Sequence, residues 1–248
     1  MKSRFFLLFS IFVALFLSSC KTLFPAKANA DLIKIEKSAT TDTALITFYK
    51  PYKDSLDKMM QIKIAELETD LYKKQPESTL GNLMADILFA ETKQHLKQPV
   101  DFGVMNYGGI RVSSLSKGNL MINDAYLISP FDNYLVAQKV SGMQVQAICD
   151  SLALKGGWPV SGITFEIKNK KAQHIQIQHQ NLDLSKTYTM ATIDYVANGG
   201  DGMSLLKAVP QMATGVLFRD AIIDYWKMQT QLGKKINAQH ENRITNVE

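Results

Sequence analysis

Three segments of the 248-residue sequence place polar or aromatic side chains that could do chemistry beside glycines or a proline. The first is residues 106–111, Asn-Tyr-Gly-Gly-Ile-Arg, which follow the strand-like residues 102–105. Paired glycines allow a sharp backbone turn and let a ligand approach without a Cβ in the way. Arg111 adds a planar guanidinium that suits phosphate or ribose oxygens. Taken alone, this segment is better explained as an ordinary tight turn with a surface arginine.

The other two segments supply an aromatic ring and a carboxylate. In residues 130–133, Pro-Phe-Asp-Asn, the proline stiffens the chain before Phe131, which is either a core residue or an exposed stacking plate. In residues 194–202 three glycines surround Asp201, so the backbone is expected to fix a carboxylate that can accept two hydrogen bonds from vicinal hydroxyls. A calcium loop would need further spaced acidic ligands, and a phosphate loop would need a following Lys-Ser/Thr or a GxGxxG pattern; the segment has neither.

No nucleophile with a credible base accompanies these segments. The sequence has no Gly-x-Ser-x-Gly motif, no Cys–His pairing and no defensible pair of carboxylates. His174 and His179 flank an alternating segment and are expected on the surface. By itself the chain is therefore expected to bind a ligand without cleaving it.

The elements that must position these segments mix helices and strands without a regular βαβ order, which predicts an α+β class. We expect a single domain in which helices flank mixed sheets. Helical patterns cover residues 52–60, 80–96, 145–154 and 216–231. Strand patterns cover residues 62–71, 101–106, 118–122, 134–140, 163–167, 175–178, 188–193 and 243–247.

Two of these elements carry finer expectations. Ser78 or Thr79 should cap the second helix. Its apolar side is expected to comprise Leu83, Met84, Ile87, Leu88 and Ala90. The inward residues of the first strand are expected to be Ile62, Ile64, Leu67 and Leu71.

The N-terminus resembles an export signal. Two basic residues precede an apolar run from residue 5 to residue 17, and Leu-Ser-Ser leads to Cys20. This pattern predicts a lipoprotein signal peptide at residues 1–19, with lipidation of Cys20, because the apolar run is too short for a permanent span. An ordinary signal peptide with a chance cysteine, or an uncleaved anchor, is the alternative. Residues 20–43 should form a tether to a domain at 44–248, so we expect a bacterial membrane location facing the periplasm or the cell surface.

Charge and cysteine content exclude some other classes. The formal net charge is +5, and the lysines are scattered, which argues for a solvated surface and against a nucleic-acid partner. The sequence has only one cysteine besides Cys20. This residue, Cys149, lies in an apolar stretch and is expected to be a buried small hydrophobe.

In this order, the segments Glu77-Ser78-Thr79-Leu80-Gly81-Asn82-Leu83-Met84-Ala85-Asp86, Asn-x-Gly-Gly-Ile-Arg, Pro-Phe-x-Asn and Gly-Gly-Asp-Gly form a strong set. From about Ala44 to the C-terminus the chain resembles the C-terminal domain of the 5′-nucleotidase/UDP-sugar hydrolase family. The resemblance implies a nucleoside slot in which two aromatic rings clamp the base. The rings would be Phe131 and Tyr195, where many relatives have a second Phe.

The same match assigns the polar contacts. Asp201 would hold the ribose hydroxyls, while Asn106 and Arg111 would contact the nucleotide, with Arg111 toward the phosphate. Asn133 and Gly162 would line the base side. Relatives often carry another arginine shortly before the Glu-Ser segment, where this chain has Lys73 and Lys74. Because lysine does not reproduce a bidentate arginine, a phosphate contact in that region is in question.

The resemblance also implies a missing half. The family's catalytic domain is a metallophosphatase with Asp-x-His, Gly-Asn-His-Glu and His-x-His motifs, and none of the four histidines here stands in such a motif. We expect no room for that fold before Ala44 and no cofactor in this chain. Divalent metals are expected on a separate metallophosphatase subunit.

Three hypotheses follow. The leading one is the substrate-binding half of a split 5′-nucleotidase, which positions a nucleoside or nucleotide for a separate catalytic chain. The second is a non-catalytic nucleoside-binding surface lipoprotein. The third is a structural protein that has lost the site, against which the retention of Phe131, Tyr195, Asp201 and Arg111 argues.

Overall fold

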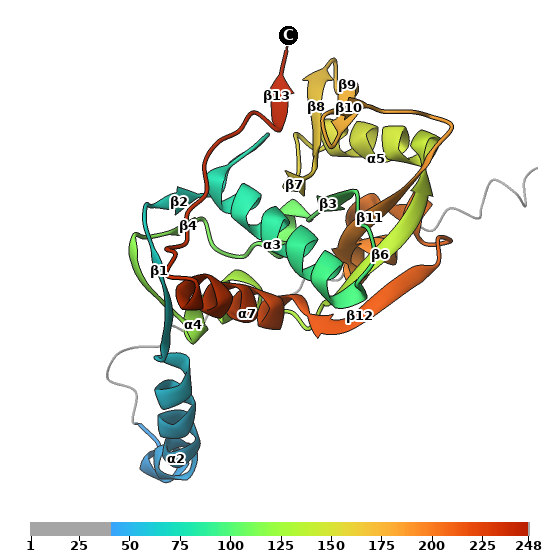
Figure 1. The fold of residues 1–248 in the computed structure, drawn as a ribbon. Coiled ribbons are helices and arrows are strands. Elements are labelled where there is room, and N and C mark those ends of the chain that lie inside the picture. The colour runs from blue at the N-terminus through green and yellow to red at the C-terminus, as the bar shows by residue number, and fades with distance from the viewer. Residues whose placement is uncertain (1–40, 248) are drawn as a thin grey trace, which may run out of the picture. The chain divides into compact units, whose positions relative to one another are not determined.

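The computed structural model describes residues 41–247 (Figure 1). The predicted signal peptide (1–19), the lipidation site Cys20 and nearly all of the predicted tether (20–43) lie outside the described residues. The described residues fall into two units that meet between Phe48 and Tyr49, and each unit is treated separately. Helix α2 (Thr43–Met60) begins in the first unit, earlier than the predicted residue 52, and buries none of its residues. Every helix within residues 41–247 is too short or too polar to span a membrane.

The larger unit is built on a mixed five-stranded sheet in the order β12-β6-β11-β3-β7 (Figure 1). The strands in this order are Gln211–Leu217, Tyr134–Ser141, Thr187–Ile193, Phe102–Val104 and Val160–Ser161. Only β3 and β11 run parallel; the other neighbours are antiparallel. The ends of three strands therefore meet at one edge of the sheet: the C-terminal ends of β3 and β11 and the N-terminal end of β6.

Helix α3 (Thr79–Leu96) packs against all five strands of this sheet. Ser78 is its N-cap, as predicted, because the Ser78 hydroxyl accepts a hydrogen bond from the Gly81 amide at 3.1 Å. Its apolar face is buried at Leu80, Leu83, Met84, Ile87 and Leu88, whereas Ala90 is only half-buried. This face forms the centre of the core.

A second sheet has the order β10-β9-β8-β13. Its strands are Gln180–Asn181, Lys171–Ile177, Ile163–Lys168 and Ile244–Asn246. Helix α5 (Gly142–Leu154) contacts strands of both sheets, and it buries Cys149 completely, as the sequence predicted. The buried Arg243 donates to both carboxylate oxygens of Asp86 on α3, at 2.7 and 2.8 Å, which fastens the C-terminal strand to the core.

The remaining elements flank α3 or form short ladders. Helices α4 (Ile122–Ile128) and α7 (Phe218–Gln231) pack against each other, and α7 also packs against α3. The short ladders pair β1 (Lys63–Leu67) with β5 (Gly118–Met121) and β2 (Leu71–Tyr72) with β4 (Ser114–Leu115). The predicted α+β class, with mixed sheets flanked by helices, is confirmed.

Several local predictions were wrong, among them the single strand at 62–71, which the structure divides into β1 and β2. Ile62 was expected to point inward but is 50% exposed, because a bulge between Lys63 and Ala65 shifts the alternation of β1. The last long helix starts at Phe218 rather than at residue 216, because the preceding residues pair with β6 as strand β12. The sequence pattern also missed helix α4 altogether.

Candidate functional site

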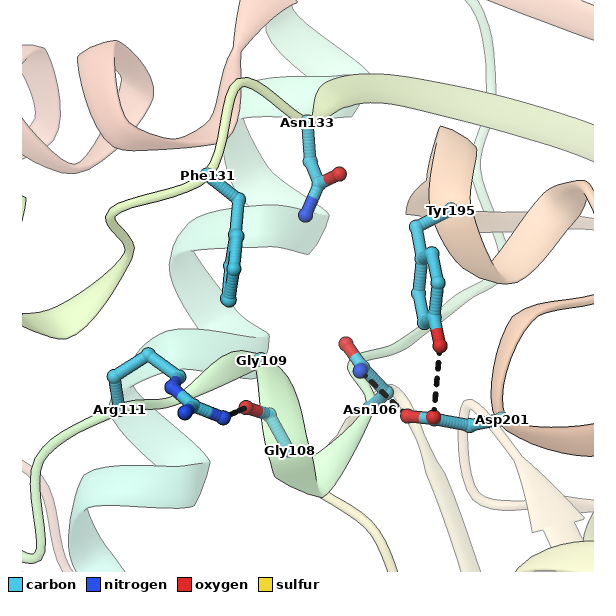
Figure 2. A pocket seen from close by; sticks show the side chains of 8 residues that line it. All are labelled: Asn106, Gly108, Gly109, Arg111, Phe131, Asn133, Tyr195 and Asp201. Carbon is cyan, nitrogen blue, oxygen red and sulfur yellow. Dashed lines mark hydrogen bonds between the residues drawn. The ribbon is translucent and has the colours of Figure 1, made fainter. Parts of the chain in front are cut away.

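Six of the seven substrate-binding residues named from the sequence line one pocket of about 260 Å³ (Figure 2). They come from the three chain segments that meet at one edge of the central sheet. The lining consists of Asn106, Gly108, Gly109, Arg111, Phe131, Asn133, Tyr195 and Asp201. The two glycines were expected from the sequence to allow a sharp turn and the close approach of a ligand, and both lie in the pocket wall.

Residues 106–111 leave the end of β3 through a 3₁₀ turn, Tyr107–Gly109. A Cβ on Gly109 would lie 2.5 Å from both the Asn106 amide oxygen and the Met105 methyl, so any other residue here would displace the side chain of Asn106. Arg111 is anchored by its backbone N–H, which donates to the Ile128 carbonyl at 2.9 Å. Its side-chain Nη1 donates to the Gly108 carbonyl at 3.3 Å, so the guanidinium is held at the pocket wall.

Lys73 supports this wall from outside the pocket. Its ammonium donates to the Ile110 carbonyl at 2.7 Å and lies 4.0 Å from the centroid of the Tyr107 ring. Burial lowers the pKa of Lys73, and the charge of Arg111 lowers it further. Because its ammonium contacts the Ile110 carbonyl and the Tyr107 ring, Lys73 stabilises the position of residues 107–111.

The carboxylate of Asp201 is the best-fixed polar group of the pocket. Asn106 Nδ2 donates to its Oδ2 at 2.7 Å, and the Tyr195 hydroxyl donates to its Oδ1 at 2.9 Å (Figure 2). Asp201 also adopts a left-handed backbone conformation, with φ of 49°. The sequence predicted that the backbone alone would hold this carboxylate, but two side-chain hydrogen bonds share that task.

Tyr195 belongs to the short helix α6 (Asp194–Ala197), directly after β11. A Cβ on Gly200 would lie 2.5 Å from Tyr195 Cε1, so glycine at this position lets the ring take its place. The hydrogen bond to Asp201, together with the negative charge of that carboxylate, raises the pKa of the Tyr195 hydroxyl. The phenol therefore stays protonated and keeps donating at neutral pH.

Phe131 and Tyr195 are exposed side chains, at 42% and 45%, and so neither belongs to the core. Figure 2 shows the two rings on opposite sides of the pocket, with the space between them open. Arg111 lies 5.6 Å from the Phe131 ring centroid, within the range of a cation–π contact. Phe131 was expected to be either a core residue or an exposed ring available for stacking, and the structure favours the exposed ring.

Gly162 is the one named residue that the structure places elsewhere. It lines a different pocket, together with Ser161, Gln178 and Arg243. Its φ is 73°, and a Cβ would lie 2.8 Å from the Asp101 carbonyl oxygen. Gly162 thus serves the turn between β7 and β8.

The described part of the chain, residues 41–247, holds no group of three or more His, Cys, Asp or Glu side chains that could bind a metal ion. Each imidazole except that of His179 lies beside a glutamate. His174 Nδ1 is 2.8 Å from Glu166, while His95 and His240 lie 3.5 Å from Glu91 and Glu77. The exposed position predicted for His174 is confirmed.

The sequence patterns did not identify the ion pair between Asp132 and Arg219 beside the pocket. Arg219 Nη2 donates to Asp132 Oδ1 at 2.8 Å, between residues that lie 87 positions apart in the chain. Asp132 sits between two pocket residues, but its identity alone gives no signal of a partner so distant in sequence.

Comparison with known proteins places the chain in a family. The model of the 5′-nucleotidase C-terminal domain matches residues 61–208. A 5′-nucleotidase of Vibrio vulnificus is 31% identical over 186 residues, which are 71% of this chain and 32% of that protein. Protein UshA of Escherichia coli is 28% identical over 199 residues, 76% of this chain and 35% of that protein.

A solved structure agrees with the sequence relatives. The crystal structure of a 5′-nucleotidase precursor from Thermus thermophilus matches with a TM-score of 0.69 at 27% identity, over 83% of this chain and 42% of that one. The chain spans about a third of the length of the curated relatives it matches. By sequence and by fold, this chain belongs to the 5′-nucleotidase C-terminal domain family.

Proposed function

We propose that this domain binds a nucleoside or nucleotide and acts as the substrate-binding half of a split 5′-nucleotidase. One observation carries the proposal: two exposed aromatic rings face each other across a pocket of about 260 Å³ that also contains a fixed carboxylate and a guanidinium. The rings are those of Phe131 and Tyr195, and the charged groups belong to Asp201 and Arg111.

Each group has a natural counterpart in a nucleotide. A base between the rings would gain about 1–3 kcal/mol per stacked aromatic, and such stacking tolerates different bases. The Asp201 carboxylate can accept from both hydroxyls of a ribose, because each of its oxygens has a second lone pair beyond the bond that it already accepts. Arg111 suits a phosphate, and Asn133 can donate to or accept from the edge of a base.

Hydrolysis then belongs to another chain. We assign the divalent metals to a separate metallophosphatase subunit, for which this domain holds the nucleotide in a reactive orientation. Lipidation at Cys20 and a membrane location facing the periplasm or cell surface belong to the same proposal. Their support is the apolar run and the Leu-Ser-Ser-Cys sequence.

Binding is tested by calorimetric titration of adenosine and AMP into the folded protein. Phe131→Ala and Asp201→Ala should each weaken binding, whereas Tyr72→Ala, at an exposed tyrosine outside the pocket, should leave it unchanged. Wild-type affinity in a folded double variant of Phe131 and Asp201 would remove the proposed pocket.

The split enzyme is tested by purifying the native protein from its own membranes in mild detergent. A co-purifying chain with metallophosphatase motifs, together with metal-dependent release of phosphate from AMP, would support it. A protein that binds adenosine but yields neither would instead be a nucleoside-binding lipoprotein without a catalytic partner.

A further inference from the structure

The loop of residues 130–133 carries one wall of the pocket, yet core packing does not fix its aromatic ring. Phe131 is 42% exposed, and its neighbour Asp132 is exposed over 77% of its side chain. The loop belongs to no helix or strand. An exposed ring on an irregular loop needs another restraint if it is to stay opposite Tyr195.

Helix α7 supplies that restraint at its first two residues. The Phe218 N–H donates to the Asn133 carbonyl at 2.8 Å, and Arg219 Nη2 donates to Asp132 Oδ1 at 2.8 Å. Two adjacent residues of the helix thus hold two adjacent residues of the loop. The loop is fastened directly after Phe131.

Arg219 is itself held firmly. Its side chain is only 11% exposed, and its guanidinium lies 4.4 Å from the centroid of the Tyr126 ring on helix α4. A planar guanidinium packed on a ring loses little further freedom when it forms a hydrogen bond. Its buried Nε has no hydrogen-bond partner among the described residues, so the bond to Asp132 is the only side-chain hydrogen bond found for this guanidinium there.

We propose that Arg219 is a positioning residue for the pocket, which holds Phe131 and Asn133 opposite Tyr195 through Asp132. This inference rests on the proposed nucleoside-binding function. Arg219 touches no ligand in this role. Without the ion pair the loop samples other positions, and the apparent affinity falls in proportion to the fraction of molecules that keep the binding geometry.

The acidic partner offers the cleaner variant, because Arg219 is buried and its replacement can unfold the protein. Asp132→Ala removes the ion pair at an exposed position, and Asp132→Glu keeps the charge. Glu66→Ala is the matched control, since it removes an exposed carboxylate that pairs with Lys235 on a ladder outside the pocket. We expect Asp132→Ala to raise the dissociation constant for adenosine about three- to tenfold, with Asp132→Glu and Glu66→Ala near wild type.

A second measurement needs no ligand. Amide hydrogen exchange of the peptide that spans residues 127–135 should be faster in Asp132→Ala than in wild type, with any other change confined to the start of α7, where the Phe218 N–H donates to Asn133. Faster exchange together with weaker binding supports the positioning role. Unchanged exchange and unchanged affinity overturn it.

The remaining outcomes are also decisive. Faster exchange with unchanged affinity would mean that the position of the loop does not limit binding, which overturns the inference. Weaker binding with unchanged exchange would mean that the Asp132 charge acts on the ligand directly, which overturns the inference. If wild-type protein binds no nucleoside, the proposed function fails. In that case the exchange rates still decide whether Arg219 holds the loop.

Discussion

On the proposed nucleoside-binding function, Asp201→Asn should separate sugar recognition from base stacking. In the wild-type pocket, Asn106 donates to one carboxylate oxygen at 2.7 Å and Tyr195 donates to the other at 2.9 Å. An asparagine at this position has one oxygen and one NH₂ group. The Asn106 amide nitrogen cannot accept a hydrogen bond, so the new oxygen must face Asn106 and the new NH₂ must face the Tyr195 hydroxyl. The packing survives, but one acceptor for the sugar is lost.

The expected loss follows from the strength of these bonds. A hydrogen bond to a charged group contributes about 1.5–3 kcal/mol and a neutral one about 0.5–1.5 kcal/mol. Because Asp201 is exposed, we expect the lost hydrogen bond to the sugar to contribute less than the upper limit for a charged group. A loss of about 1–2 kcal/mol corresponds to an adenosine dissociation constant about 5- to 30-fold higher.

Calorimetric titration with three ligands checks this reasoning. Adenosine should bind the variant more weakly, free adenine should bind it as it binds wild type, and 2′-deoxyadenosine should lose less affinity than adenosine. In a second assay, phenolate absorbance is titrated against pH, with the Tyr195→Phe variant subtracted to isolate one of the nine tyrosines. The pKa of Tyr195 is raised by Asp201 in wild type, so it should fall toward the ordinary tyrosine value in Asp201→Asn. Equal losses for adenine and adenosine would refute the assignment of Asp201 to the sugar.

Three further predictions concern stacking, buried charge and reactivity. Phe131→Ala should weaken adenine and adenosine equally, by about 1–3 kcal/mol in the same titrations; a loss confined to adenosine would argue against a base-stacking role. Burial raises the pKa of Glu91, with a smaller contribution from Asp224, so the folded protein holds this proton more tightly than the unfolded protein does. The free energy of unfolding therefore falls as the pH rises from the unfolded-state pKa of Glu91 through its folded-state pKa. Glu91→Gln should therefore have a higher urea midpoint than wild type at pH values above the folded-state pKa of Glu91, and the difference should disappear in acid. Equal midpoints at every pH would contradict a raised pKa for Glu91. Burial also raises the pKa of Cys149, so iodoacetamide should modify it only as the protein unfolds in urea, whereas rapid labelling of native protein would disprove its burial.

The sequence predicted best the elements that local patterns determine. Helix α3 was placed within one residue of its observed start because an apolar periodicity and a capping serine coincide there. Strand β12 was missed because its last two residues, Val216 and Leu217, continue into the apolar start of α7, and only pairing with β6 makes the segment a strand. Pairing between distant segments has no local signal.

The same distinction applies to the pocket. Six of the named residues meet because their segments stand at the ends of strands that share one sheet edge, and strand ends can be located from sequence. Gly162 came from a family match alone, and its backbone conformation serves a turn elsewhere. Arg219 lies 87 residues from Asp132, and no periodicity or motif joins them.

The two aromatic plates are held in different ways, which divides the pocket into two parts. Tyr195 is fixed locally, by Asp201 six residues later and by the space that Gly200 leaves. Phe131 depends on the distant helix α7, through Asp132 and Asn133. The proposed sugar side is therefore set by one short stretch of chain, whereas the width of the proposed base slot is set by tertiary packing. Changes in α7 should alter base stacking while leaving the sugar contact intact, whereas a change at Tyr195 should alter both, because its ring lines the base slot and its hydroxyl holds Asp201.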